Sequence, residues 1–142
     1  MKRMIVTDAS VILKWAFNAQ PDEQDTAKAE FLLQGWVDGT YDIVLPSLWT
    51  FEVANVLGLK VPDMADALME VFLDYRFASI EITQDLCRKA FDIMKKHDVT
   101  FYDAIYHAIA LKQKGLLVTA DEAYYRKVKG FGHITLLKDF SL

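Results

Sequence analysis

The chain alternates between short apolar segments and longer segments whose apolar residues recur at helical spacing. Runs such as "IVTD" and "LLVTA" have the length and the nearly unbroken hydrophobicity of strands that are buried on both faces. Runs such as "DLCRKAFDIMKKH" are amphipathic and end in basic residues, as helices commonly do. The pattern predicts strands at residues 4–8, 42–46, 79–83, 116–120 and 133–137, and helices at residues 10–17, 22–39, 48–59, 64–77, 85–97, 100–115 and 122–129.

Strands that alternate with helices in this way favour an α/β fold with a central, mostly parallel sheet and helices on both of its faces. Ser47 is expected to N-cap the helix at 48–59, and Pro62 with Asp63 opens the next helix. In such sheets the ligand site lies beyond the carboxyl ends of the strands, near a switch in strand order. Chemically active residues are therefore sought at those strand ends.

Size and composition narrow the class of protein. A chain of 142 residues, with 53% hydrophobic and 25% charged residues, fits one globular domain and not a disordered chain. The apolar start "MIV" is too short for a signal peptide, and no stretch is long enough to cross a membrane, so we expect a cytoplasmic protein without a membrane partner. The lone Cys87 excludes an intramolecular disulfide and a cysteine-cluster zinc site.

Two acidic residues follow strands in nearly the same way. Asp8 ends "IVTD" and Asp121 ends "LVTAD". Each could be the N-cap of the helix that follows, or a carboxylate that its strand delivers to a site. On the residues alone both interpretations stay open.

Two further acids stand in apolar helices. Glu52 is the only charged residue in "SLWTFEVANVLGL", and Asn55 lies on the same face of that helix. A carboxylate buried there needs a partner, which is either a structural salt bridge or a site. Asp103 lies three residues after Thr100, an arrangement that resembles a capping box. His107, one turn after Asp103, is either a packed histidine or a site residue.

These four carboxylates would repel one another if they met. Two unit charges about 5 Å apart repel by roughly 3 kcal/mol at an effective dielectric near 20, a large share of the stability of one domain. Such a cluster therefore requires protonation or a divalent cation, and oxygen-only ligands suit Mg²⁺ or Mn²⁺. Water activated by such an ion and attacking a phosphodiester would follow. The net charge of −4 speaks against a general nucleic-acid coat but leaves a nucleic-acid enzyme possible.

The chain resembles the PIN-domain nucleases, most closely the VapC-type toxins of toxin–antitoxin pairs. The resemblance spans nearly the whole chain through "IVTDASVILKW", "LPSLWTFEVANVL" and "TFYDAIYHAIALKQKGLLVTADEAYY". It implies a single PIN domain at 1–142 with a three-layer PIN-like fold, and an endoribonuclease that cleaves single-stranded or loop RNA with Mg²⁺ or Mn²⁺. The family's catalytic and metal-binding acids fall on Asp8, Glu52, Asp103 and Asp121, with Asp8 and Asp103 favoured as direct ligands.

The resemblance also implies residues that orient these acids and partners that bind the chain. Thr7, Ser10, Asn55 and Thr119 are expected to orient the carboxylates or water, Asn55 and Thr119 foremost. A homodimer and a small antitoxin protein are implied as partners. The segment "GLKVPDMADALM" varies among relatives, so the identity of the antitoxin stays open.

Two other functional classes fit the residues less well. A phosphoacceptor receiver domain would carry paired acids after its first strand and an acceptor aspartate after a middle strand, whereas Asp8 stands alone and "DIVLPS" offers no acceptor. A phosphatase that starts "DxDxT" fails because "DAS" lacks the second aspartate. The remaining alternative is a non-catalytic PIN-like scaffold that binds RNA or protein. The four acids argue against it.

Overall fold

A computed structural model describes residues 2–141 and shows a five-stranded sheet in which all neighbouring strands are parallel. The strand order is β3-β2-β1-β4-β5, so the chain moves outward from β1 in one direction and then returns to add β4 and β5 on the other side. The strands are β1 (Arg3–Thr7), β2 (Tyr41–Pro46), β3 (Ala78–Ile80), β4 (Leu116–Thr119) and β5 (Ile134–Leu136).

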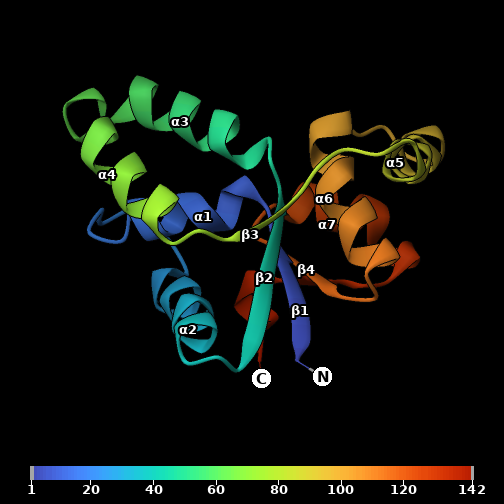
Figure 1. Ribbon diagram of the computed structural model, residues 1–142, viewed down its shortest axis with the longest axis horizontal. Coiled ribbons are helices and arrows are strands. Elements are labelled where there is room, and N and C mark those ends of the chain that lie inside the picture. The colour runs from blue at the N-terminus through green and yellow to red at the C-terminus, as the bar shows by residue number, and fades with distance from the viewer. Residues whose placement is uncertain (1, 142) are drawn as a thin grey trace.

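Helices cover the sheet on both faces, which gives three layers (Figure 1). The helices α1 to α4 lie on one face, and α5, α6 and α7 lie on the other (Figure 1). This division follows from right-handed crossovers, because the connections from β1 to β3 run in one direction along the sheet and those from β3 to β5 run in the other. The helices are α1 (Ala9–Ala16), α2 (Thr26–Val37), α3 (Trp49–Lys60), α4 (Pro62–Asp74), α5 (Gln84–Lys96), α6 (Phe101–Lys112) and α7 (Glu122–Val128), with short 3₁₀ turns at Lys129–Phe131 and Leu137–Asp139.

The central strands supply the core. Ile5 and Val6 of β1 and Val118 of β4 are completely buried, as expected for strands covered on both faces. The helix α6 lies against these strands, and all its residues from Ala104 to Ala110 are buried. The predicted α/β class, with a central parallel sheet between two helical layers, is confirmed.

Three local expectations are wrong. The strand expected at 79–83 is only Ala78–Ile80, because β3 is an edge strand that pairs with β2 alone and whose first two residues are exposed. The helix expected from residue 22 begins at Thr26, since Asp25 before it adopts a left-handed backbone with φ of 58°. Ser47 does not cap α3. The N-cap is Leu48, and the carbonyl of Ser47 accepts a hydrogen bond from Thr50 Oγ1 at 3.1 Å.

The order of the strands places a switch point between β1 and β4. These two neighbours are paired through Thr7 and Val118, and the connections that follow them diverge to opposite faces. The carboxyl ends of β1 and β4 therefore mark the edge of the sheet at which α/β proteins of this kind bind ligands. No helix within residues 2–141 is long and apolar enough to cross a membrane.

Candidate active site

Asp8 and Asp121 both lie at this switch point, one residue beyond β1 and two residues beyond β4. Each is the N-cap of the following helix, yet their side chains behave differently. Oδ1 of Asp121 accepts a hydrogen bond from the backbone N–H of Tyr124 at 2.9 Å, which is a true cap. The side chain of Asp8 makes no capping bond to α1. The capping interpretation therefore accounts for Asp121 only.

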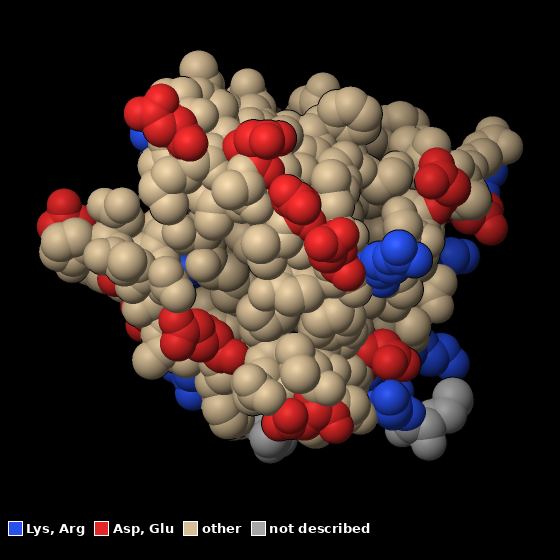
Figure 2. Space-filling model, turned by 60° about the vertical axis from the view of Figure 1, so that its left-hand side comes forward, with Lys and Arg blue, Asp and Glu red and all other residues tan. Residues whose placement is uncertain are grey.

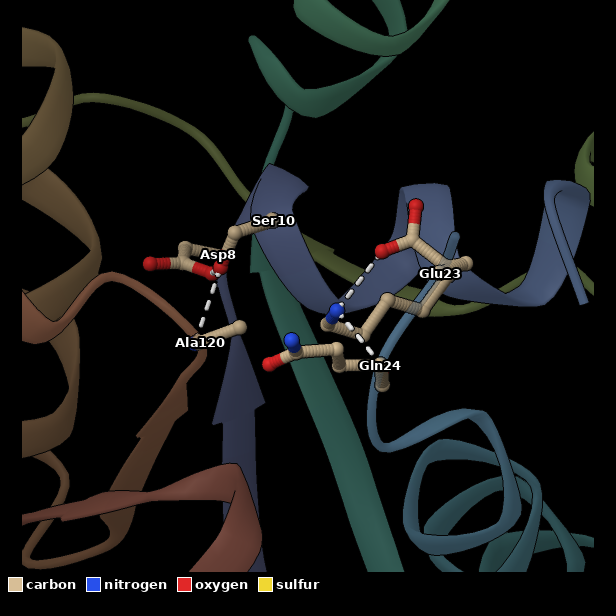
Figure 3. Close-up of polar contacts among 6 residues, drawn as sticks. Asp8, Ser10, Glu23, Gln24 and Ala120 are labelled. Atoms are coloured by element: carbon tan, nitrogen blue, oxygen red, sulfur yellow. Dashed lines mark hydrogen bonds and ion pairs between the residues drawn. The ribbon is translucent and has the colours of Figure 1, made fainter. Parts of the chain in front are cut away.

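The carboxylate of Asp8 is held by two hydroxyl groups that come from different elements. Ser10, in the first turn of α1, donates to Oδ1, and Thr119, the last residue of β4, donates to Oδ2. Each hydroxyl is itself fixed by a backbone N–H: Ala120 N–H donates to Ser10 Oγ at 3.0 Å, and Asp121 N–H donates to Thr119 Oγ1 at 3.0 Å. Figure 3 shows Ser10 beside Asp8, with Ala120 approaching from the β4 side. Both carboxylate oxygens are thus oriented by the residues of two adjacent strand ends.

A cation lies on the same helix as Ser10 but is paired elsewhere. Lys14 Nζ contacts Glu23 Oε2 at 2.8 Å and the carbonyl of Gln24 at 2.7 Å (Figure 3). The side chain of Lys14 is only 11% exposed, so this ion pair is largely removed from water. The charge of Lys14 is balanced by Glu23, and Asp8 receives no direct ion pair from it.

Glu52 and Asp103 come to the site from helices on opposite faces of the sheet. Glu52 is partly buried in the first turn of α3, and Tyr106 of α6 donates a hydrogen bond to its Oε1 at 2.6 Å. Asp103 lies in the first turn of α6, where its backbone N–H donates to Thr100 Oγ1 at 3.2 Å. Both acids line one surface pocket of about 420 Å³, whose lining is Phe51, Glu52, Asn55, Thr100, Tyr102 and Asp103.

The pKa values of three of these acids, Asp8, Glu52 and Asp103, are raised by burial and in part by the charge of another acid of the set. Burial, above all, raises the pKa of Asp8 to about 6, and the charges of Asp103 and Asp121 add to the increase, while the hydrogen bonds from Ser10 and Thr119 oppose it. Burial also raises the pKa of Glu52, as does the charge of Asp103. The pKa of Asp103 is raised by burial and by the charge of Asp121. The four carboxylates form one electrostatically coupled group.

The four acids influence one another but are not drawn together into a compact metal cluster. Among residues 2–141, no three side chains of His, Cys, Asp or Glu converge closely enough to form a ready metal site. The acids nevertheless offer only oxygen atoms, which is the donor set that hard divalent cations prefer. Acidic side chains also form a row across the face of the molecule in Figure 2, in keeping with the net charge of −4.

The four residues expected to orient the acids differ in what they contact. Ser10 and Thr119 contact Asp8 directly. Asn55 is exposed and lines the pocket beside Glu52. Thr7 is buried, and within the described residues its hydroxyl oxygen has no hydrogen-bond partner, so it makes no hydrogen bond to any of the four acids.

The structure decides between the two interpretations of His107 and brings Tyr106 to the site. His107 is completely buried, with Nδ1 3.1 Å from the Tyr124 hydroxyl and Nε2 2.8 Å from the carbonyl of Gly132, so it is a packed histidine. Tyr106 was missed, although it contacts Glu52. The only sequence signal was its position three residues after Asp103, on the same side of α6.

Comparison with known proteins identifies the family of the chain. A family model described as the PIN domain matches residues 5–130. A curated relative, ribonuclease VapC3 of Pyrobaculum aerophilum, is 30% identical over 131 residues, which cover 87% of this chain and 93% of the relative.

Solved structures share the fold. A toxin–antitoxin complex from Klebsiella pneumoniae contains a chain that superposes with a TM-score of 0.67 at 17% identity, covering 97% of this chain and 99% of that one. VapC20 of Mycobacterium tuberculosis, described as a toxin that cleaves the sarcin–ricin loop, superposes with a TM-score of 0.64 at 17% identity, covering 86% of this chain and 93% of that one. At these identities the structures support the fold alone.

Proposed function

This chain belongs to the PIN-domain family, and we propose that it is a metal-dependent endoribonuclease that acts as the toxin of a type II toxin–antitoxin pair. The observation that supports the nuclease assignment is the coupling of four carboxylates at the carboxyl-terminal edge of one parallel sheet. Burial first, and then the charges of the neighbouring acids, raise the pKa values of Asp8, Glu52 and Asp103, and keeping such carboxylates charged is costly for a fold unless their charge has a use.

The acids fit a divalent ion in donor type and in charge. Asp8, Glu52, Asp103 and Asp121 would hold Mg²⁺ or Mn²⁺ through carboxylate oxygens, and no sulfur or imidazole donor is needed. When bound, the ion would supply positive charge that activates water and stabilises the oxygens of a phosphodiester during hydrolysis. Asp8 and Asp103 are the residues that we propose as principal ligands.

Three hydroxyl groups of the chain hold two of the four acids in place. Ser10 and Thr119 fix both oxygens of Asp8, and Tyr106 fixes one oxygen of Glu52. Hydroxyl groups that hold the ligands of a metal in place commonly raise metal affinity and activity. Their presence at two of the four acids supports a metal-binding role over a purely structural one.

RNA, an antitoxin and a second copy of this chain are the proposed partners. The RNA assignment rests on the relative that carries the name ribonuclease and on the structural neighbour described as cleaving an RNA loop. The antitoxin assignment is supported by the neighbour that belongs to a toxin–antitoxin complex. The homodimer is proposed on the family resemblance only.

The test is RNA cleavage by Asp103→Asn. The parent chain, incubated with total RNA and Mg²⁺, is expected to cleave it in a reaction that EDTA stops, and Asp103→Asn is expected to lose at least 100-fold in rate while its melting temperature persists. Asp74→Asn, at the exposed end of α4, is the matched control and should cleave as the parent does. If Asp103→Asn cleaves as fast as the parent, the catalytic assignment is wrong. If the parent binds RNA without cleaving it, the chain is a binding scaffold.

A further inference from the structure

Two aromatic side chains stand in the open beside the acids. Phe51 is 78% exposed and Tyr102 is 62% exposed, and each directly precedes one of the acids of the pocket, Glu52 and Asp103. Both rings line the same pocket of about 420 Å³ as these two carboxylates. Most other large aromatic side chains, such as Tyr41 and Phe140, are buried in the core. In the folded chain these two rings are therefore exposed to water beside the two carboxylates.

The residues of this pocket do not attract the phosphate backbone of RNA. None of its six lining residues is basic, and two are carboxylates that repel a phosphate backbone. The side chains of this pocket therefore offer no positive charge to the phosphates, and other groups must add to the affinity for a nucleic acid. Exposed aromatic rings bind unpaired bases by stacking, which needs no charge and tolerates any base.

Tyr102 also lines a second, adjoining pocket. This pocket has a volume of about 230 Å³, and its lining is mainly apolar, including Leu48, Ile80, Ile82 and Phe101. The ring of Tyr102 is thus shared between an acidic pocket suited to the reacting phosphate and an apolar pocket suited to the flat face of a base. A base in a duplex has both faces covered by its neighbours, so only an unpaired base can use this surface.

We propose that Phe51 and Tyr102 are base-stacking residues that hold unpaired nucleotides of the RNA beside the acidic pocket. This inference rests on the proposed function and adds to it the residues that provide substrate affinity. Neither ring touches the reacting atoms. They bind substrate, so their loss should raise Kd and KM more than it lowers kcat.

The experiment measures binding of labelled single-stranded oligo(A) and oligo(U) to the Asp103→Asn chain in Mg²⁺, in which cleavage is blocked. Phe51→Ala and Tyr102→Ala are each expected to weaken binding by about tenfold, which is within the range of measured stacking contributions. Phe51→Trp should retain binding. Phe31→Ala is the matched control, because Phe31 is 45% exposed on α2 and lines neither pocket. Melting temperatures confirm that each variant folds.

An oligonucleotide with abasic sites separates stacking from an indirect effect. The abasic oligonucleotide should bind the Asp103→Asn chain with both rings intact about as weakly as the intact oligonucleotide binds the two alanine variants. Adding Phe51→Ala should not weaken binding of the abasic oligonucleotide further. Steady-state cleavage of total RNA by variants that keep Asp103 should show the expected rise in KM.

Several outcomes would overturn the inference. Unchanged RNA affinity in both alanine variants would do so, as would equal losses on intact and abasic oligonucleotides. Loss of binding to an antitoxin with RNA affinity intact would mean that the rings dock protein. In each of these cases cleavage by the parent would still uphold the nuclease, whereas a parent that neither binds nor cuts RNA would remove both proposals.

Discussion

The hydroxyl of Tyr106 donates a hydrogen bond to Oε1 of Glu52 at 2.6 Å, across 54 residues of sequence. Tyr106 is 1% exposed, so this hydroxyl is shielded from water, and among residues 2–141 its hydrogen-bond acceptor is Glu52. The bond lowers the pKa of Glu52 against the effect of burial, and it fixes one oxygen of the carboxylate. Tyr106 is therefore a positioning residue for Glu52.

Replacing Tyr106 by Phe should slow RNA cleavage by roughly tenfold while the fold remains intact. The ring that fills the core is kept, and only the hydroxyl that orients Glu52 is removed, at a cost of about 1–2 kcal/mol in the free energy of unfolding. Cleavage rates as a function of Mg²⁺ concentration should show that more metal is needed for half-maximal rate.

Tyr124→Phe is the control for this change. It also removes a buried hydroxyl, but one whose hydrogen-bond partner is Nδ1 of His107, at 3.1 Å, and not a carboxylate. It should lower stability to a similar extent and leave the Mg²⁺ dependence unaltered. Identical Mg²⁺ curves for Tyr106→Phe and the parent would contradict the positioning role.

Two threonines at neighbouring strand ends should respond in opposite ways to the same substitution. Thr119→Val removes the donor to Asp8 and the acceptor for Asp121 N–H, so it should lower the free energy of unfolding by about 1–3 kcal/mol and slow cleavage. Thr7→Val removes a buried hydroxyl that has no partner within the described residues, so it should raise stability by about 1 kcal/mol and preserve cleavage. Chemical denaturation and an RNA cleavage assay measure both effects, and Thr119→Ser should restore cleavage. A loss of activity in Thr7→Val would place Thr7 among the orienting residues after all.

The order of strands and helices was predictable because hydrophobic periodicity is a local property of the sequence. Asp8 and Asp121 stood out as candidates because polar residues that directly follow buried strands reach the edge of a parallel sheet. Tyr106 did not stand out, since a tyrosine in an apolar helix has the pattern of a core residue until the partner of its hydroxyl is known. The late start of α2 depends on the left-handed backbone of Asp25, for which the sequence offers no signal.

Mg²⁺ or Mn²⁺ should raise the melting temperature of the parent and affect Asp8→Asn much less. On the proposed function the ion would bind the four acids of the folded chain and relieve their repulsion, whereas the unfolded chain spreads the acids apart. A ligand at about 100 times its Kd stabilises a fold by about 2.7 kcal/mol. Thermal melts with EDTA and with increasing Mg²⁺ measure the effect. Asp74→Asn should respond as the parent does, and equal shifts in the parent and Asp8→Asn would argue against a carboxylate metal site.

Without metal, the stability of the fold should decrease as the pH rises through the range from about 4 to about 6. Burial raises the pKa of Asp8 from an ordinary 3.8 to about 6, so in this range the folded chain keeps a proton that the unfolded chain has lost. The difference corresponds to on the order of 3 kcal/mol, absent below pH 4 and fully expressed above pH 6. The raised pKa values of Glu52 and Asp103 act in the same direction.

Comparison of the parent with Asp8→Asn isolates the part of this decrease that belongs to Asp8, because the remaining acids titrate in both proteins. In EDTA, Asp8→Asn should gain stability relative to the parent between pH 4.5 and pH 7.5, as measured by denaturant unfolding at each pH. Adding Mg²⁺ at pH 7.5 should reverse the ranking, because only the parent then recovers the energy of its charged carboxylate through the ion. A stability difference between the two proteins that stays constant with pH would mean that Asp8 is not held as a buried, repelled carboxylate in the folded chain.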